Sequence, residues 1–112
     1  MRLNMEVLKD TLLVRPGGEL DLAMADRFRV AMEETMDLQP VRNIVFNLSH
    51  VSFIDSSGLG VLLGRYKRVA KNGGKVILVG VQPQVRRILE LSGLLRIMGE
   101  SASEEEAVER VS

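Results

Sequence analysis

Short apolar runs alternate along the chain with segments in which apolar residues recur every three or four positions. Strands are predicted where the runs are continuous, over residues 5–8, 12–15, 43–48, 76–79 and, near the end of the chain, 96–98. The first two runs flank Lys9 and Asp10, which is the spacing of a β-hairpin. The Pro-Gly-Gly sequence at residues 16–18 is expected to end the second strand.

The segments with helical spacing are bounded by residues that start and stop helices. Asp21 is a good N-cap residue for the first of them. Pro83 suits the first position of a later helix, which Gly93 ends. Ser103 and Glu106 have the spacing of a capping box ahead of a C-terminal helix.

The clearest helix pattern follows Asp55. Its apolar residues fall three or four positions apart and are Leu59, Leu62, Leu63, Tyr66, Val69 and Ala70. Arg65, Arg68 and Lys71 are expected on the polar side of this helix. Residues 72–74, Asn-Gly-Gly, end it in the manner of a left-handed cap.

Strands that alternate with helices and consist of continuous apolar runs are typical of a sheet covered by helices. We therefore predict the α/β class, with a mixed, mostly parallel sheet of about five strands and about four helices. A length of 112 residues fits one domain, residues 1–112.

Composition excludes several kinds of site. The absence of cysteine excludes disulfides and thiolate metal sites, and a single histidine excludes a multi-histidine metal cluster. Fifteen basic and fifteen acidic residues cancel, so the chain lacks the net charge usual in nucleic-acid and membrane-surface binders. No targeting segment or membrane-spanning run is visible. We expect a cytoplasmic protein with no cofactor, no metal, and no direct nucleic-acid or membrane partner.

The zero net charge conceals three blocks. Residues 1–55 hold six basic and nine acidic residues, residues 56–99 hold eight and one, and residues 100–112 hold one and five. The middle block therefore carries a net charge of +7, and no carboxylate occurs from Ser56 to Leu89.

Residues 55–60, Asp-Ser-Ser-Gly-Leu-Gly, lie where a strand or its trailing loop turns into the helix. Serine at a helix N-terminus is explained most simply as a cap. The alternative is phosphorylation, because the positive end of the helix tolerates a phosphate that changes the surface strongly. The residues alone do not choose between Ser56 and Ser57.

Gly58, Gly60 and Gly64 also open a helix after a strand, which suggests a small nucleotide-binding domain. Their spacing is not that of a dinucleotide or P-loop motif, and no acidic residue ends the next strand. Close approach to a neighbouring strand or a partner explains these glycines better. A Ser-His-Asp triad is disfavoured, because His50 is expected in an exposed loop and no G-x-S-x-G motif is present.

Residues 55–67, DSSGLGVLLGRYK, resemble the anti-sigma factor antagonists of the STAS domain family. Residues 18–21, Gly-Glu-Leu-Asp, and residues 87–94 agree with the same family, so the resemblance covers nearly the whole chain. It implies a STAS fold and a switch protein, not an enzyme.

In that family the unphosphorylated antagonist binds an anti-sigma factor that is a serine kinase, and so frees a sigma factor. The kinase uses its own ATP to phosphorylate the serine directly after the motif aspartate, and a serine phosphatase reverses the reaction. By position that serine is Ser56, which leaves Ser57 as the structural cap. The resemblance implies a partner-binding surface that comprises Asp21, Asp55, Ser56, Ser57, Gly58, Leu59 and Gly60.

The pathway stays open at this point. The resemblance points to the sporulation, sigma-F type of antagonist, but residues 22–25, Leu-Ala-Met-Ala, replace the polar residues usual there. A general-stress antagonist and a STAS scaffold domain are the alternatives. A phosphate on Ser56 is expected to be held by free N–H groups at the helix start, within the basic block.

Overall fold

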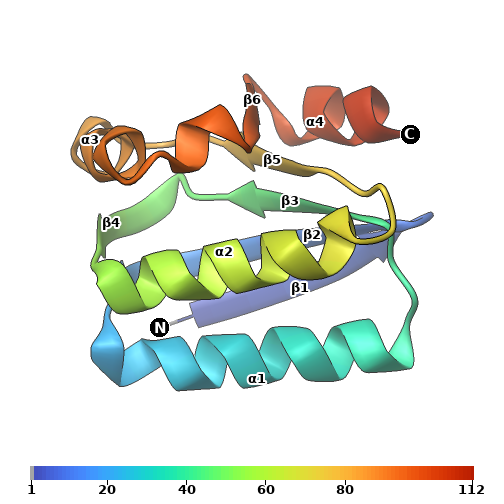
Figure 1. Ribbon diagram of the computed structural model, residues 1–112, viewed down its shortest axis with the longest axis horizontal. Helices are drawn as coiled ribbons and strands as arrows, with labels where there is room; N and C mark the ends of the chain where they lie inside the picture. Colours follow the sequence, from blue (N-terminus) through green and yellow to red (C-terminus); the bar gives the residue numbers. More distant parts are fainter. Residues whose placement is uncertain (1) are drawn as a thin grey trace.

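The computed structural model describes residues 2–112, in which four α-helices and one 3-10 helix alternate with six strands (Figure 1). In chain order the elements are β1 (Arg2–Leu8), β2 (Thr11–Leu20), α1 (Leu22–Leu38), β3 (Asn43–Asn47), β4 (His50–Ile54), α2 (Ser56–Ala70), β5 (Val76–Val79), α3 (Pro83–Ser92), η1 (Leu94–Arg96), β6 (Gly99–Ser101) and α4 (Glu104–Val111). The α/β class is confirmed, with six strands where the sequence predicts about five.

The strands form one mixed sheet in the order β1-β2-β3-β5-β6. Only β1 is antiparallel to its neighbour, because a two-residue turn joins it to β2. β4 pairs in parallel with the end of β2, beyond the part of β2 that pairs with β3. The mostly parallel arrangement is thereby confirmed.

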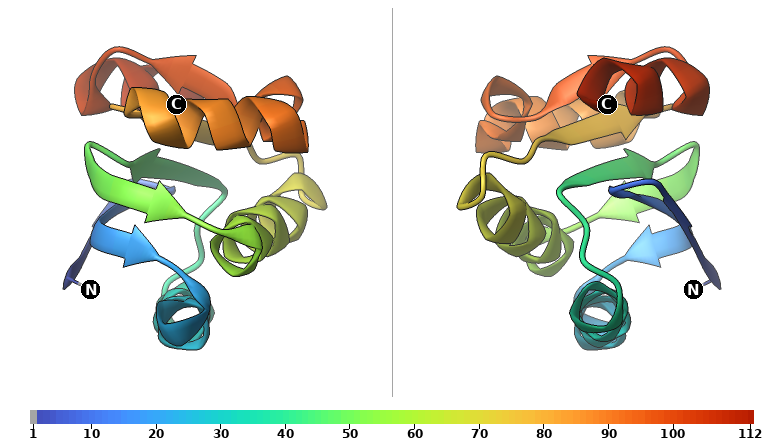
Figure 2. Two further views of the ribbon diagram at one scale, coloured as in Figure 1. Left: turned by 90° about the vertical axis from the view of Figure 1, so that its left-hand side faces the viewer. Right: turned by 90° about the vertical axis from the view of Figure 1, so that its right-hand side faces the viewer.

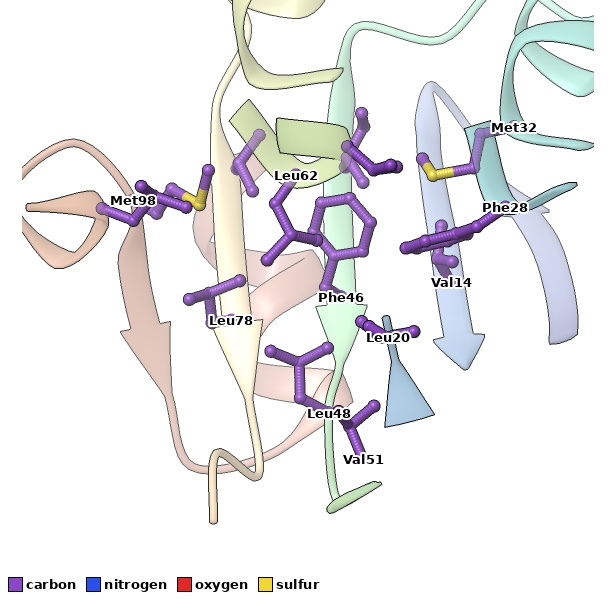
Figure 3. Close-up of a cluster of buried hydrophobic side chains, with 14 of the residues drawn as sticks. Val14, Leu20, Phe28, Met32, Phe46, Leu48, Val51, Leu62, Leu78 and Met98 are labelled. Atoms are coloured by element: carbon purple, nitrogen blue, oxygen red, sulfur yellow. The ribbon is translucent and has the colours of Figure 1, made fainter. Parts of the chain in front are cut away.

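Neighbouring residues of the central strands point to opposite faces of the sheet and enter two separate apolar clusters. On one face, residues from α1, α2 and α3 form the larger cluster with Val14, Phe46 and Leu78, which Figure 3 labels. Phe28 of α1 meets Phe46 edge to face, with ring centroids 6.2 Å apart. On the other face, Ala107 of α4 covers a smaller cluster. The core thus fixes α1 and α2 side by side on one face.

The second strand is longer than the sequence predicts. β2 continues through residues 16–18 to Leu20, because β1 and β4 both pair with this extension. Pro16 is tolerated because it lies between the last partner of β3, at Val14, and the first partner of β4, at Gly17. Its missing N–H therefore breaks no ladder hydrogen bond.

The strand predicted at residues 96–98 is wrong. Gly93 ends α3 in the left-handed conformation, at φ 83°, and the chain tightens directly into η1. The edge strand β6 begins only at Gly99, where it pairs with Ile77 of β5. Met98 is buried beneath this turn, so its apolar character reflects packing and not a strand.

The polar side of α2 is also predicted incorrectly at Arg65. This side chain is only 9% exposed, because α1 lies against α2 and brings Glu33 within 3.3 Å of its Nε. Glu33 also pairs with Arg68, at 3.0 Å, and Arg68 pairs with Asp37. Burial lowers the pKa of the Arg65 guanidinium, and the carboxylate of Glu33 opposes that shift.

Candidate functional site

The helices α1 and α2 begin next to each other, at the carboxyl ends of β2 and β4. Leu20 and Ile54 are register partners at the ends of the parallel strands β2 and β4, and each helix starts two residues later. Because both strands run the same way, the two positive helix ends face the same surface. This pair of helix starts is the candidate site.

Aspartates cap both helices. The Asp21 carboxylate accepts a hydrogen bond from the N–H of Met24 at 3.2 Å. Oδ1 of Asp55 accepts from the N–H groups of Ser57, at 2.8 Å, and Gly58, at 3.1 Å. The N-cap role that the sequence predicts for Asp21 is confirmed.

Asp55 does more than cap its own helix. Its second carboxylate oxygen, Oδ2, accepts from the N–H of Leu22, the first residue of α1, at 3.0 Å. The N–H of Asp55 in turn donates to the carbonyl of Leu20 at 3.2 Å. This bond joins residues 33 positions apart in the sequence, so one side chain holds the starts of both helices together.

The assignment of Ser57 as the cap is wrong, since Asp55 holds that position. Ser57 is half-buried, whereas Ser56 is exposed at the first position of α2. Within residues 2–112 the Ser56 hydroxyl has no hydrogen-bond partner, because the cap is made entirely by Asp55. The Ser56 side chain therefore does not contribute to the cap of α2.

The glycines differ in what surrounds them. A Cβ on Gly58 would overlap the carbonyl oxygen of Leu20 and lie 2.8 Å from Cγ1 of Ile54, so close approach to a strand is confirmed there. Gly60 and Gly64 have open space where a Cβ would be. Of the expected surface residues, Gly60 is exposed, while Gly58 is buried and Leu59 packs against the core.

A shallow groove of about 330 Å³ runs between the two helix starts. It is lined by Leu22, Ala25, Asp26, Arg29, Ser57, Gly60 and Val61. Leu22 is 76% exposed, which is unusual for a large apolar residue beside a cap. The sequence did not predict Leu22 and Arg29 as surface residues of the site. Leu22 could have been recognised, because it is a large apolar residue directly after a capping aspartate.

Two expectations for a phosphate on Ser56 fail at this surface, and His50 does not lie in the loop that the sequence predicts for it. The N–H groups of Ser57 and Gly58 are bonded to Asp55, so they do not cradle a phosphate or nucleotide. His50 begins β4 rather than lying in a loop, and the strand holds it about 16 Å from Asp55. The first basic residue of α2, Arg65, lies nine positions or about 13 Å beyond Ser56 and is paired with Glu33.

Within residues 2–112 no cluster of three potential metal ligands occurs, and no helix has the length and apolar character to cross a membrane. The sequence profile of the STAS domain matches residues 2–107. The chain belongs to the STAS domain family.

Two relatives of this STAS domain are named as anti-sigma factor antagonists. It is 42% identical over 98 residues to the anti-sigma F factor antagonist of Paenibacillus polymyxa, a match that covers 88% of this chain and 84% of the relative. It is 32% identical over 100 residues to the anti-sigma-B factor antagonist of Staphylococcus aureus, covering 88% and 92%.

Solved structures agree. The unphosphorylated anti-sigma factor antagonist SpoIIAA matches the STAS domain with a TM-score of 0.86 and 33% identity, over 98% of this chain and 96% of SpoIIAA. The phosphorylated form of Bacillus SpoIIAA matches with a TM-score of 0.77 and 33% identity, over 99% and 100% of the two chains. The STAS fold expected from the sequence is confirmed.

Replacing Asp55 with asparagine is expected to lower the free energy of unfolding by about 2 kcal/mol, because the carboxylate serves three N–H groups at two helix ends. Asp21→Asn is the matched control, since Asp21 serves one N–H and asparagine caps nearly as well, within about 0.5 kcal/mol. Urea unfolding of both variants measures the difference. Equal losses would show that the bond to Leu22 carries no stability.

Proposed function

We propose that this STAS domain is an anti-sigma factor antagonist whose unphosphorylated form binds a serine-kinase anti-sigma factor and releases a sigma factor. Ser56 is the phosphorylated residue that switches binding off. The observation that carries the proposal is that, of the two serines in the motif, Ser56 is the exposed one and takes no part in the Asp55 cap. A kinase can therefore reach its hydroxyl without breaking a hydrogen bond of the fold.

The binding surface in this proposal is the pair of helix starts. Asp21 and Asp55 hold the backbone in place there. Leu22 and Gly60 contact the partner, and Ser56 lies at the edge of the surface. Leu22 supplies exposed apolar area, and the absence of a side chain at Gly60 leaves room for a partner to approach α2. Ser57 and Gly60 line the same groove as Leu22. Gly58 and Leu59 affect binding only by positioning α2, because both pack toward the sheet and the core.

A phosphate on Ser56 acts at the interface in this proposal. It would add about −1.5 to −2 charges beside two carboxylates whose N–H donors are already used. A partner packed over the helix starts would have to desolvate that charge, and the N–H groups of Ser57 and Gly58 are already bonded to Asp55. A serine phosphatase would restore binding by removing it.

For the pathway, we propose release of a sporulation sigma factor of the sigma-F type, in the cytoplasm. The higher identity to the anti-sigma F antagonist, 42% against 32% for the anti-sigma-B antagonist, supports this choice over general stress. ATP then belongs to the kinase, consistent with helix-start N–H groups that are already occupied by Asp55.

Incubation with the cognate kinase anti-sigma factor and labelled ATP tests the assignment of the serine. Ser56→Ala is expected to reduce phosphate incorporation to background, because it removes the more exposed of the two hydroxyls in the motif while leaving the Asp55 cap intact. Ser57→Ala, the matched control, is expected to be phosphorylated like the wild type. Full labelling of Ser56→Ala would refute the assignment of the switch to Ser56.

A further inference from the structure

The outer edge of β1 has no strand beside it in the part of the chain that the structure describes, and both views in Figure 2 place β1 at the margin of the sheet. The hairpin turn contains two residues, so Leu8 and Thr11 form the closing hydrogen-bonded pair. Hydrogen-bonded pairs alternate from there, so even-numbered residues of β1 bond to β2. The backbone groups of Leu3, Met5 and Val7 therefore point to the free edge.

Side chains on this strand also alternate. Leu3, Met5 and Val7 are half-buried and pack toward the cluster beneath α1, while the even-numbered residues are exposed on the other face. Beside Leu3, a groove of about 540 Å³ lies between β1 and α1, and its lining includes Val30 and Ala31. Val30 is 38% exposed there. An added strand would place its own apolar side chains over this groove.

We propose that β1 pairs antiparallel with β1 of a second copy of this chain, with the two-fold axis at Asn4, to form a symmetric dimer with a continuous sheet. In this register Arg2 stands opposite Glu6 of the second copy, twice. Leu3 stands opposite Met5 of the second copy, also twice, and these are the residues whose backbone groups are free. Charge pairs thus lie on one face and apolar pairs on the face of the groove.

The strand favours its own copy over other partners because its charges are self-complementary. Arg2 and Glu6 are both exposed and lie at equal distances from Asn4, on the same face. Within its own chain Glu6 also pairs with Arg15 at 3.1 Å, but its side chain is still 48% exposed and can meet a second cation from the other copy. Shifting the register by two residues would place Arg2 against Leu8 and lose both charge pairs. The pairing is isologous, so it uses up both free β1 edges and closes at two chains.

Sedimentation equilibrium of charge variants of the full chain tests the proposal. The wild type is expected to show a reversible monomer–dimer equilibrium between micromolar and millimolar concentration. Arg2→Glu alone and Glu6→Arg alone are each expected to weaken the dimer about tenfold or more, because two attractive pairs become repulsive. A mixture of the two variants is expected to restore the dimer, since each chain then faces opposite charges.

Met5→Pro gives an independent measurement. Met5 donates its N–H to the free edge and not to β2, so proline is expected to abolish the dimer while leaving the far-ultraviolet circular dichroism unchanged. Lys67→Glu, exposed on α2, is the control for an equal change of net charge and should dimerise normally. A monomer at all wild-type concentrations, no association in the mixture, or an intact Met5→Pro dimer would each overturn the proposal.

Discussion

Gly58→Ala is expected to lower the free energy of unfolding by about 3 kcal/mol, near the upper end for inserting a single methyl group into a packed region. The added Cβ would overlap the carbonyl oxygen of Leu20 and lie 2.8 Å from Ile54 Cγ1. Neither the backbone of β2 nor the side chain beneath α2 has room to retreat, because both Leu20 and Ile54 are 1% exposed. Relief therefore requires α2 to move away from the sheet.

Gly60→Ala is the matched control, two residues along the same helix. Nothing lies within 4 Å of a Cβ at Gly60, so this change is expected to raise stability by up to about 1 kcal/mol through helix propensity. Denaturant unfolding of both variants gives the comparison. If the two substitutions had the same effect, the close contact between α2 and β2 would be refuted.

Ser56→Asp is expected to weaken binding to the kinase anti-sigma factor about a hundredfold or more, with the melting temperature nearly unchanged. An acidic residue at the first position of α2 suits the positive helix end, so the fold tolerates it. At the proposed interface the same charge would have to be desolvated, and Asp55 already occupies the N–H groups of Ser57 and Gly58. Isothermal titration with the nucleotide-bound kinase measures the loss.

Lys67→Glu controls for net charge, since Lys67 is exposed eleven residues further along α2. It alters the total charge by two units yet lies away from the helix starts, so its affinity is expected to stay within about twofold of the wild type. Wild-type affinity for Ser56→Asp, or an equal loss for Lys67→Glu, would show that the switch does not act through local charge at Ser56.

Short-range signals in the sequence predicted most of the elements. The cap at Asp21, the left-handed end at Gly93 and the hydrogen bond from Glu106 to Ser103 all depend on residues within one helical turn, and all three are present. The strands at residues 43–48 and 76–79 were recognisable because both faces are buried, which removes polar positions from the pattern.

Long-range contacts explain what the sequence did not predict. β2 extends past Pro16 because β1 and also β4, more than thirty residues later, pair with it. Arg65 is buried only because Glu33 of α1 lies opposite. The hydrogen bond from the N–H of Leu22 to Asp55 Oδ2 likewise joins residues 33 positions apart, which no local pattern in the sequence specifies.

The ion pairs connect the three charge blocks of the sequence. Arg65 and Arg68 of the basic middle block meet Glu33 and Asp37 of the first block, and Arg86 meets Glu100 of the last. Three of the eight basic residues in the middle block are thus paired with carboxylates from the two acidic blocks. During synthesis from the N-terminus, Arg65 and Arg68 emerge after their acidic partners, whereas Arg86 must wait for Glu100. Arg15 of β2 waits longer still, for Glu104 of α4, so the ion pair that is completed last joins the second strand to the last helix.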